Sequence, residues 1–157
     1  MEPLILEEKA MKATIKSWQW LGYLGLLPFV GCLWLFKLFE QNTISNMLFN
    51  PQQAFQFYSV IILTFLAGTL WRKDPNTTYS ATQITSNLFC LYAYIWLFMP
   101  LYYSLIFLPV GYLSLLIAEY MLNKNREMLW FTPYFTMRLT LTFVVLILHA
   151  VAFLAWF

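Results

Sequence analysis

The stretch YSATQITSNLFCLYAYIWLFMPLYYSLIFLPVGYLSLLIAEYML, residues 79–122, decides the fold, because it forms either one very long helix or two shorter ones. As one α-helix it would be roughly 60 Å long, about twice the hydrocarbon thickness of a bilayer. Pro100 lies near its middle, and a proline disfavours helical backbone angles in the residue before it. The stretch therefore predicts two helices, 79–98 and 101–122, joined by a minimal turn at Pro100.

The composition around this stretch is that of a membrane protein. Hydrophobic types make up 61% of the 157 residues and charged types only 10%, whereas a soluble domain has about 45–50% apolar and about 25% charged residues. A transmembrane helix needs about 20 predominantly apolar residues. Five such helices with short loops use nearly the whole chain, so we expect one transmembrane domain over residues 1–157 and no separate soluble domain.

The predicted domain is all-α and polytopic, with five transmembrane helices. We expect them over about 18–39, 54–71, 79–98, 101–122 and 133–157. Pro28 falls inside the first helix, where a proline removes a backbone hydrogen bond and can kink the helix. Residues 1–16 mix apolar and charged types at roughly helical spacing, which predicts an amphipathic helix in the interface, with a frayed tail as the alternative.

The distribution of basic residues supports five helices independently of Pro100. Positive charges in short loops mark the cytoplasmic side of a membrane protein. With the N-terminus inside and the C-terminus outside, eight of the nine Lys and Arg residues lie inside and Lys37 alone lies outside. If residues 79–122 were one helix, the split would be five against four. The charge pattern thus favours five helices in this orientation.

Two ionisable residues are predicted within the transmembrane helices at similar depth. Glu119 lies about one turn from the end of its helix, and Arg138 lies about one turn into the next. A buried charge is costly unless it is paired, so we expect an ion pair between these helices, structural more than catalytic. The alternative is that each side chain extends separately to the interface.

The other candidate polar sites are His149, Gln83 and Asn87. His149 is the only histidine, and it is expected either to form a hydrogen bond between helices as a neutral ring or to have a functional role. Gln83 and Asn87 belong to an unusually polar helix half that also contains Thr82, Thr85 and Ser86. These side chains predict hydrogen bonds between helices, or, alternatively, the wall of a polar substrate cavity.

No catalytic pattern is present in the sequence. It contains no HExxH, CxxC, GxSxG or Walker loop and no paired carboxylates for acid–base chemistry. We therefore expect no enzyme activity, no catalytic or metal-ligating residue and no cofactor. A soluble basic face for nucleic acid is also missing. The expected partners are the lipid bilayer and either another membrane protein or a second copy of the chain.

Three stretches resemble a known family: LGLLPF at 24–29, YSVIILTFLAGTLW at 58–71 and RLTLT at 138–142. They are similar to a small five-helix bacterial inner-membrane family of unknown function that also includes a mitochondrial transmembrane protein of animals. In that family the second stretch ends with two glycines, an apolar residue and then His or Arg before Trp. Here Ala67 and Leu70 replace the first glycine and the polar residue, so no proton or ligand role carries over to that position.

The resemblance implies a multi-pass protein of the bacterial inner membrane, with the mitochondrial inner membrane as the alternative. Similar small bacterial membrane proteins are implicated in the permeability barrier of the envelope. The leading functional hypothesis is therefore a non-enzymatic protein that supports envelope integrity through lipid or lipopolysaccharide handling. The alternatives are a small transporter or lipid-binding carrier, and an accessory subunit or assembly factor of a respiratory complex.

Overall fold

The computed structural model describes residues 20, 22–41, 50–71, 79–122 and 133–157, and all regular structure within them is helical. The elements are α2 (Leu27–Gln41), α3 (Pro51–Gly68), the short 3₁₀ helix η1 (Thr69–Trp71), α4 (Tyr79–Ile95), α5 (Leu101–Leu122) and α6 (Pro133–Trp156). The all-α prediction is confirmed for this part of the chain. The predicted interfacial helix over 1–16 lies outside it.

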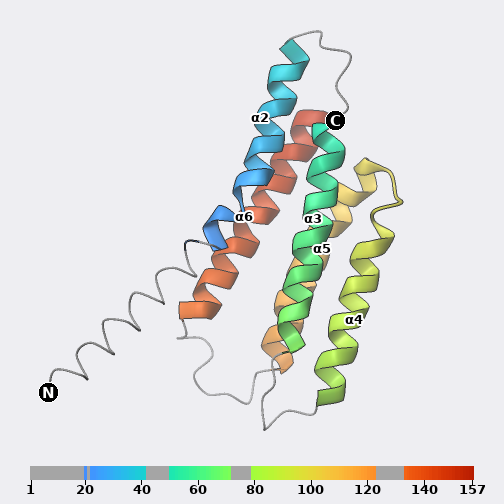
Figure 1. The fold of residues 1–157 in the computed structure, drawn as a ribbon, viewed down its shortest axis with the longest axis vertical. Helices are drawn as coiled ribbons and strands as arrows, with labels where there is room; N and C mark the ends of the chain where they lie inside the picture. Colours follow the sequence, from blue (N-terminus) through green and yellow to red (C-terminus); the bar gives the residue numbers. More distant parts are fainter. Residues whose placement is uncertain (1–19, 21, 42–49, 72–78, 123–132) are drawn as a thin grey trace, which may run out of the picture.

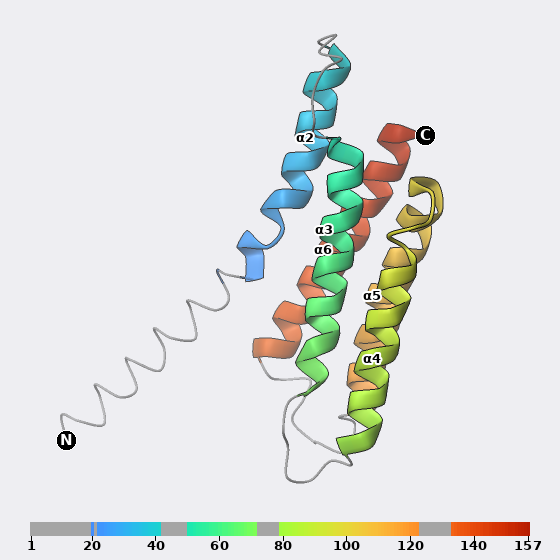
Figure 2. The same ribbon diagram turned by 45° about the vertical axis from the view of Figure 1, so that its right-hand side comes forward.

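The five α-helices of the described residues form an up-and-down bundle in which each helix runs antiparallel to the one before it (Figures 1 and 2). Helix α3 packs against α2, α4 and α5, and α6 packs against α5 and, more lightly, α2. The bundle has two ends: α3 and α5 begin at the end where the C-terminus lies, and α4 and α6 begin at the other (Figure 1).

The deciding stretch forms two helices, as the position of Pro100 predicts. Helix α4 ends at Ile95, and α5 begins at Leu101, the predicted residue. Residues 96–98 form a tight turn in which Trp96 N, Leu97 N and Phe98 N each donate a hydrogen bond, 3.1–3.2 Å long, to the carbonyl oxygen three residues earlier. The predicted end of α4 at 98 was thus three residues too late, because the chain turns before it reaches the proline.

The first predicted helix, 18–39, is interrupted in the structure. The helical segment that contains Gly22 ends at a turn over Gly25 and Leu26, and α2 begins at Leu27 with Pro28 in its first turn. The Tyr58 hydroxyl of α3 donates a 2.7 Å hydrogen bond to the Gly25 carbonyl oxygen. The neighbouring helix thereby satisfies a backbone group that the break leaves without a helical partner.

Helix α3 begins three residues before the predicted position, at Pro51 instead of residue 54. The Asn50 side-chain oxygen accepts a 3.0 Å hydrogen bond from Gln52 N, which is the contact of an N-cap residue. Pro51 follows in the first helical turn, where its missing N–H costs nothing. These two local signals override the polar character of residues 50–53, which predicted a loop.

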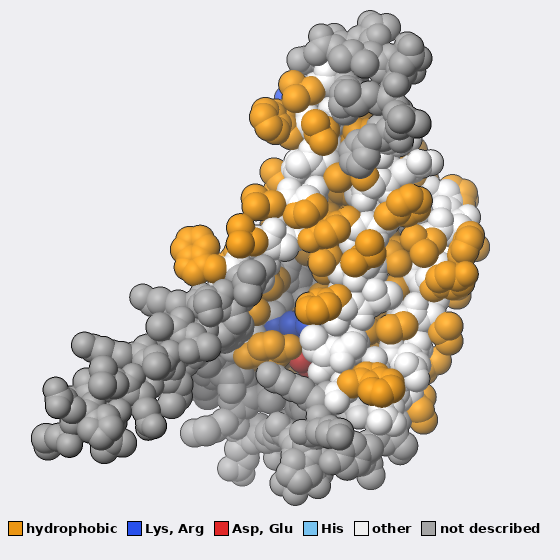
Figure 3. Space-filling view, viewed as in Figure 1, with side chains coloured by type: hydrophobic (Ala, Val, Ile, Leu, Met, Phe, Trp, Pro, Cys, Tyr) orange, Lys and Arg blue, Asp and Glu red, His pale blue; other side chains and the backbone are white. Residues whose placement is uncertain are grey.

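Three of the described helices are long and apolar enough to cross a membrane: Pro51–Trp71, Leu101–Leu122 and Tyr134–Trp156. The segment Gly22–Leu38 is apolar but shorter. Large hydrophobic side chains such as Phe65, Phe143 and Leu154 are exposed on the outside of the bundle, an arrangement compatible with contact to a lipid bilayer. Figure 3 shows such side chains over much of one face.

Helices α3, α4 and α5 pack closely together at Gly111 of α5. A Cβ atom placed there would be 2.6 Å from Tyr92 Cε1 of α4 and 2.9 Å from Leu63 Cδ2 of α3. Both distances are shorter than a real Cβ tolerates, so a glycine is required for α3, α4 and α5 to meet at this level.

Candidate functional site

Glu119 of α5 and Arg138 of α6 form the predicted ion pair. Arg138 Nε lies 2.9 Å from Glu119 Oε2, and their side chains are only 4% and 9% exposed. The prediction of a paired charge between these helices is confirmed. Oε2 lacks an aligned hydrogen-bond donor, so the contact is an ion pair of close charges more than a directed hydrogen bond.

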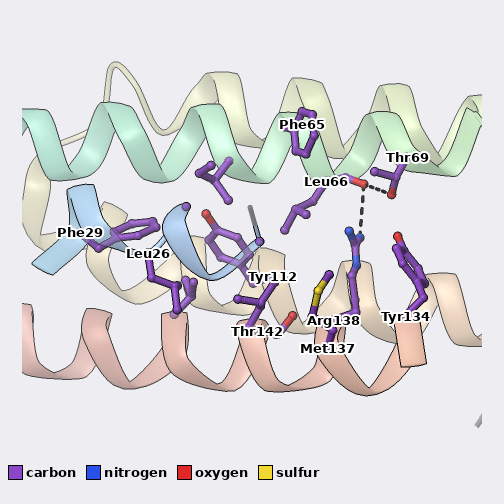
Figure 4. Close-up of a pocket in the computed structure, with 15 residues that line it drawn as sticks. Leu26, Phe29, Phe65, Leu66, Thr69, Tyr112, Tyr134, Met137, Arg138 and Thr142 are labelled. Atoms are coloured by element: carbon purple, nitrogen blue, oxygen red, sulfur yellow. Dashed lines mark hydrogen bonds between the residues drawn. The ribbon is translucent and has the colours of Figure 1, made fainter. Parts of the chain in front are cut away.

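The guanidinium group of Arg138 has one further bond to the described residues. Its Nη2 donates a 3.3 Å hydrogen bond to the Leu66 carbonyl oxygen near the end of α3, which also accepts from the Thr69 hydroxyl at 2.7 Å (Figure 4). An arginine has five N–H donors. Those not directed at Glu119 or Leu66 have no partner among the described residues, and Arg138 lies at the wall of a cavity.

The cavity has a volume of about 360 Å³ and lies between the start of α2 and helices α3, α5 and α6. Its described walls are apolar or glycine except for Thr69, Tyr112, Tyr134, Arg138 and Thr142. Arg138, Tyr134 and Thr69 lie together at one end, and Leu26 and Phe29 lie at the other (Figure 4). Figure 3 shows the same face hollowed, with basic and acidic atoms visible in the hollow.

The break before α2 contributes to this cavity. Gly22, Gly25 and Leu26, which lie in or beside the break, form part of its wall. Gly22 packs closely on α6, since a Cβ there would lie 3.2 Å from both Leu141 Cδ1 and Met137 Sδ. The sequence signal for the break is Gly25 followed by Pro28, but that signal predicts a kink and not the cavity beside it.

His149 lies deeper in the bundle, and its ring is held on both sides. Its Nδ1 lies 2.9 Å from the Val145 carbonyl oxygen, and its Nε2 lies 2.9 Å from the Ser59 hydroxyl of α3. A neutral ring with its proton on Nδ1 satisfies both contacts, because it donates to the carbonyl and accepts from the serine. The predicted hydrogen bond between helices is confirmed.

Aromatic side chains enclose the ring of His149. The rings of Phe29, Phe55 and Tyr112 pack around it with centroids 5.0–5.9 Å away. The Tyr112 hydroxyl donates a 2.7 Å hydrogen bond to the Ser59 carbonyl oxygen. His149 is 1% exposed and does not line the cavity, so its position favours the structural alternative over a functional one.

A second polar cluster, the turn clamp, was not predicted from the sequence. It consists of Gln56 of α3, Ser104 of α5 and the carbonyl groups of Trp96 and Met99 in the turn between α4 and α5. Gln56 Nε2 lies 2.5 Å from Trp96 O, 3.1 Å from Met99 O and 2.8 Å from Ser104 Oγ. The clamp satisfies carbonyl groups that the end of α4 leaves without helical donors.

Gln83 and Asn87 do not belong to either cluster and do not line the cavity, so their expected role in hydrogen bonds between helices, or alternatively in the wall of a polar cavity, stays a prediction. Both side chains are exposed on α4, whereas Ser86 on the same helix is buried. Residues four apart share one helix face, so 82 and 86 turn toward the bundle while 83 and 87 turn away from it. No residue of α4 lines the cavity among the described residues.

The described wall of the cavity is mainly apolar. The described wall of the cavity contains no Asp, Glu, His, Cys or Ser side chain, the types that most often act as acids, bases or nucleophiles. Within the described part of the chain, no group of three His, Cys, Asp or Glu residues is placed to bind a metal ion. The cavity offers apolar surface, the N–H donors of one buried arginine and the side chains of two threonines and two tyrosines.

Comparison with known proteins gave one match. A model of the family described as a protein of unknown function, DUF3429, matches residues 14–154. No curated protein and no solved structure matches the chain.

Proposed function

The chain belongs to DUF3429, a family of proteins of unknown function, and we propose that it binds a lipid-like amphiphile in the cavity between α2, α3, α5 and α6. In this proposal the protein is not an enzyme. It supports the permeability barrier of the membrane by lipid handling.

The observation that carries the proposal is the cavity with Arg138 at one end. Its volume of about 360 Å³ lies within the range of roughly 300–1,000 Å³ that is typical of small-molecule sites, which are mostly apolar with a few polar groups. Arg138, Tyr134 and Thr69 lie at one end, Leu26 and Phe29 lie at the other, and Tyr112 and Thr142 lie between them (Figure 4). A molecule with a polar head and an apolar tail matches this division.

The position of the cavity in the bundle is consistent with a ligand that comes from the membrane. Arg138 lies in the second turn of α6, near the end of the bundle where α4 and α6 begin (Figure 1). The opposite wall, with Phe29 and Val145, lies further along the helices. A bilayer has the same order, because its polar head groups lie outside its hydrocarbon core.

The proposal includes the orientation that the basic residues favour. All five described α-helices cross the bacterial inner membrane, the N-terminus lies in the cytoplasm and the C-terminus lies outside. The end with Arg138 then lies on the cytoplasmic side. Alkaline phosphatase fused after Phe157 should be active in a bacterium, and an inactive fusion would exclude this orientation.

The binding proposal is tested by filling the cavity. Val145 is buried in the cavity wall, whereas Ile147 on the same helix is exposed on the outside. We expect protein purified in a mild detergent to retain an amphiphile detectable by native mass spectrometry. The variant Val145→Trp should lose it, and Ile147→Trp, which adds the same ring outside, should keep it. Equal retention by both variants would refute the proposal.

A further inference from the structure

We propose that the bound amphiphile has an anionic oxygen head group held by Arg138 and a single apolar chain. This inference rests on the proposed function and names the chemistry of its ligand. The head group is a carboxylate or a phosphate, which present the same kind of acceptor oxygen to a guanidinium group.

The first step in the argument is the unused side of the guanidinium group. Arg138 is only 4% exposed, yet its N–H groups beyond those directed at Glu119 and Leu66 have no partner among the described residues. A guanidinium group forms charge-assisted hydrogen bonds with carboxylate and phosphate oxygens, which are stronger than hydrogen bonds between neutral groups. Because Arg138 lines the cavity, an acceptor oxygen placed there can bind these further N–H groups.

The second step concerns the sign of the charge. Arg138 lines the cavity, whereas Glu119 is not part of its described wall. Glu119 lies on the Nε side of the guanidinium group, at 2.9 Å. The planar guanidinium group can bind acceptors at more than one edge. A head group in the cavity can therefore contact the guanidinium group at an edge other than the Nε edge that faces Glu119.

The third step is the separation of head and chain. Tyr134 and Thr69 lie beside Arg138 and bring hydroxyl groups to the polar end, while Leu26 and Phe29 mark the apolar end (Figure 4). The volume of about 360 Å³ is near the lower limit of roughly 300 Å³ for ligand pockets. A cavity of this size and polarity fits one chain better than the paired chains of a bilayer phospholipid.

Glu119 is a positioning residue in this proposal. It does not touch the ligand, but its charge holds the Nε side of Arg138 and compensates the burial of the cation. Replacing Glu119 should therefore weaken binding through a mispositioned Arg138, and it should not change the preference for an anionic head group over a neutral one.

The experiment uses three photoreactive probes that share one alkyl chain and differ in the head group: a carboxylate, a phosphate and an alcohol. The full-length protein is reconstituted in nanodiscs of zwitterionic lipid, and labelling is quantified by mass spectrometry. We expect both anionic probes to label the wild type about ten-fold more efficiently than the alcohol. This ratio corresponds to the one charge-assisted hydrogen bond that the alcohol cannot form. Unequal labelling by carboxylate and phosphate identifies which head group the site prefers.

The variants separate this inference from the proposed function. Replacing both Glu119→Gln and Arg138→Met removes the pair without leaving an isolated charge, and it should reduce anionic labelling to the level of the alcohol. Lys37→Gln removes an exposed cation of α2 that does not line the cavity and should change nothing. If the alcohol labels the wild type as well as the acids do, the anionic head group is refuted and the cavity proposal stands. If no probe loses labelling in Val145→Trp, the cavity proposal itself fails.

Discussion

At one end of the bundle, the turn clamp places Gln56 within hydrogen-bond distance of two carbonyl groups and of Ser104. At the other end, Arg138 has one carbonyl and one carboxylate as partners and keeps further N–H donors beside a cavity. Both side chains are buried. Among the described residues, the amide N–H groups of Gln56 all have acceptors, whereas the N–H groups of Arg138 do not.

This difference separates structural from functional burial of polar groups. A buried polar group whose donors are all used stabilises the fold and specifies a turn. A buried cation that lines an apolar cavity can instead use its further N–H donors to bind a ligand with acceptor oxygens. The comparison supports a structural role for the clamp and agrees with the proposal that the Arg138 end binds a ligand.

The largest effect on stability is expected from Arg138→Ala. The substitution removes the Arg138 cation from its ion pair with the carboxyl group of Glu119, which is 7% exposed, and removing one partner of a buried pair costs about 3–5 kcal/mol. The measurement is the free energy of unfolding in mixed detergent micelles. The double variant Glu119→Gln with Arg138→Met should recover most of the loss, and a double variant as unstable as Arg138→Ala would contradict a penalty that comes from breaking the ion pair.

A smaller loss is expected from Gln56→Leu, because it removes the donor to Met99 O and one of the two donors to Trp96 O, which also accepts from the Ser104 hydroxyl. Leaving buried acceptors unsatisfied costs about 1–3 kcal/mol. The unfolding free energy should fall by this amount, while photolabelling by the anionic probe at equal folded fraction should not change. A loss of labelling would show that the turn clamp affects binding at the Arg138 end, which would contradict the separation of the two ends.

Ser104→Ala should have a weaker effect within the same clamp. Gln56 keeps its two carbonyl acceptors in this variant, so the expected loss is about 1 kcal/mol, that of a single hydrogen bond. In a double-mutant cycle with Gln56→Leu the two losses should not add, because neighbours in one network are coupled. Strict additivity would show that Gln56 and Ser104 do not act as a unit.

The smallest effect is expected from Asn87→Ala. Asn87 is exposed on α4 and lies away from both ends of the comparison, and substitutions at such positions usually change stability by less than about 0.5 kcal/mol. Unfolding free energy and photolabelling should both match the wild type. Reduced labelling of this variant would show that the polar half of α4 contributes to ligand binding.

The sequence was sufficient where one strong local signal acts. Pro100 and the distribution of basic residues predict the two helices of residues 79–122, and the intramembrane positions of Glu119 and Arg138 predict their pairing. The start of α3 was missed, although Asn50 followed by Pro51 is a recognisable cap signal.

The cavity and the turn clamp depend on contacts between distant parts of the chain. Gln56 meets Trp96 across a sequence separation of 40 residues, and no local pattern indicates which helix a buried glutamine faces. The rotation of α4, which turns Gln83 and Asn87 outward, is also set by packing and not by the polarity of its residues. Such features follow from the bundle as a whole.

The most direct test of the central claim is the position at which an amphiphile labels the protein. An alkyl carboxylate with a photoreactive group at the far end of its chain is bound to the reconstituted protein, and the modified residues are identified by mass spectrometry. We predict labels on residues of the apolar end of the cavity, such as Phe29 and Val145, and their loss in Val145→Trp. Labels spread over the exposed residues of α4 and α6, unchanged in that variant, would contradict the account.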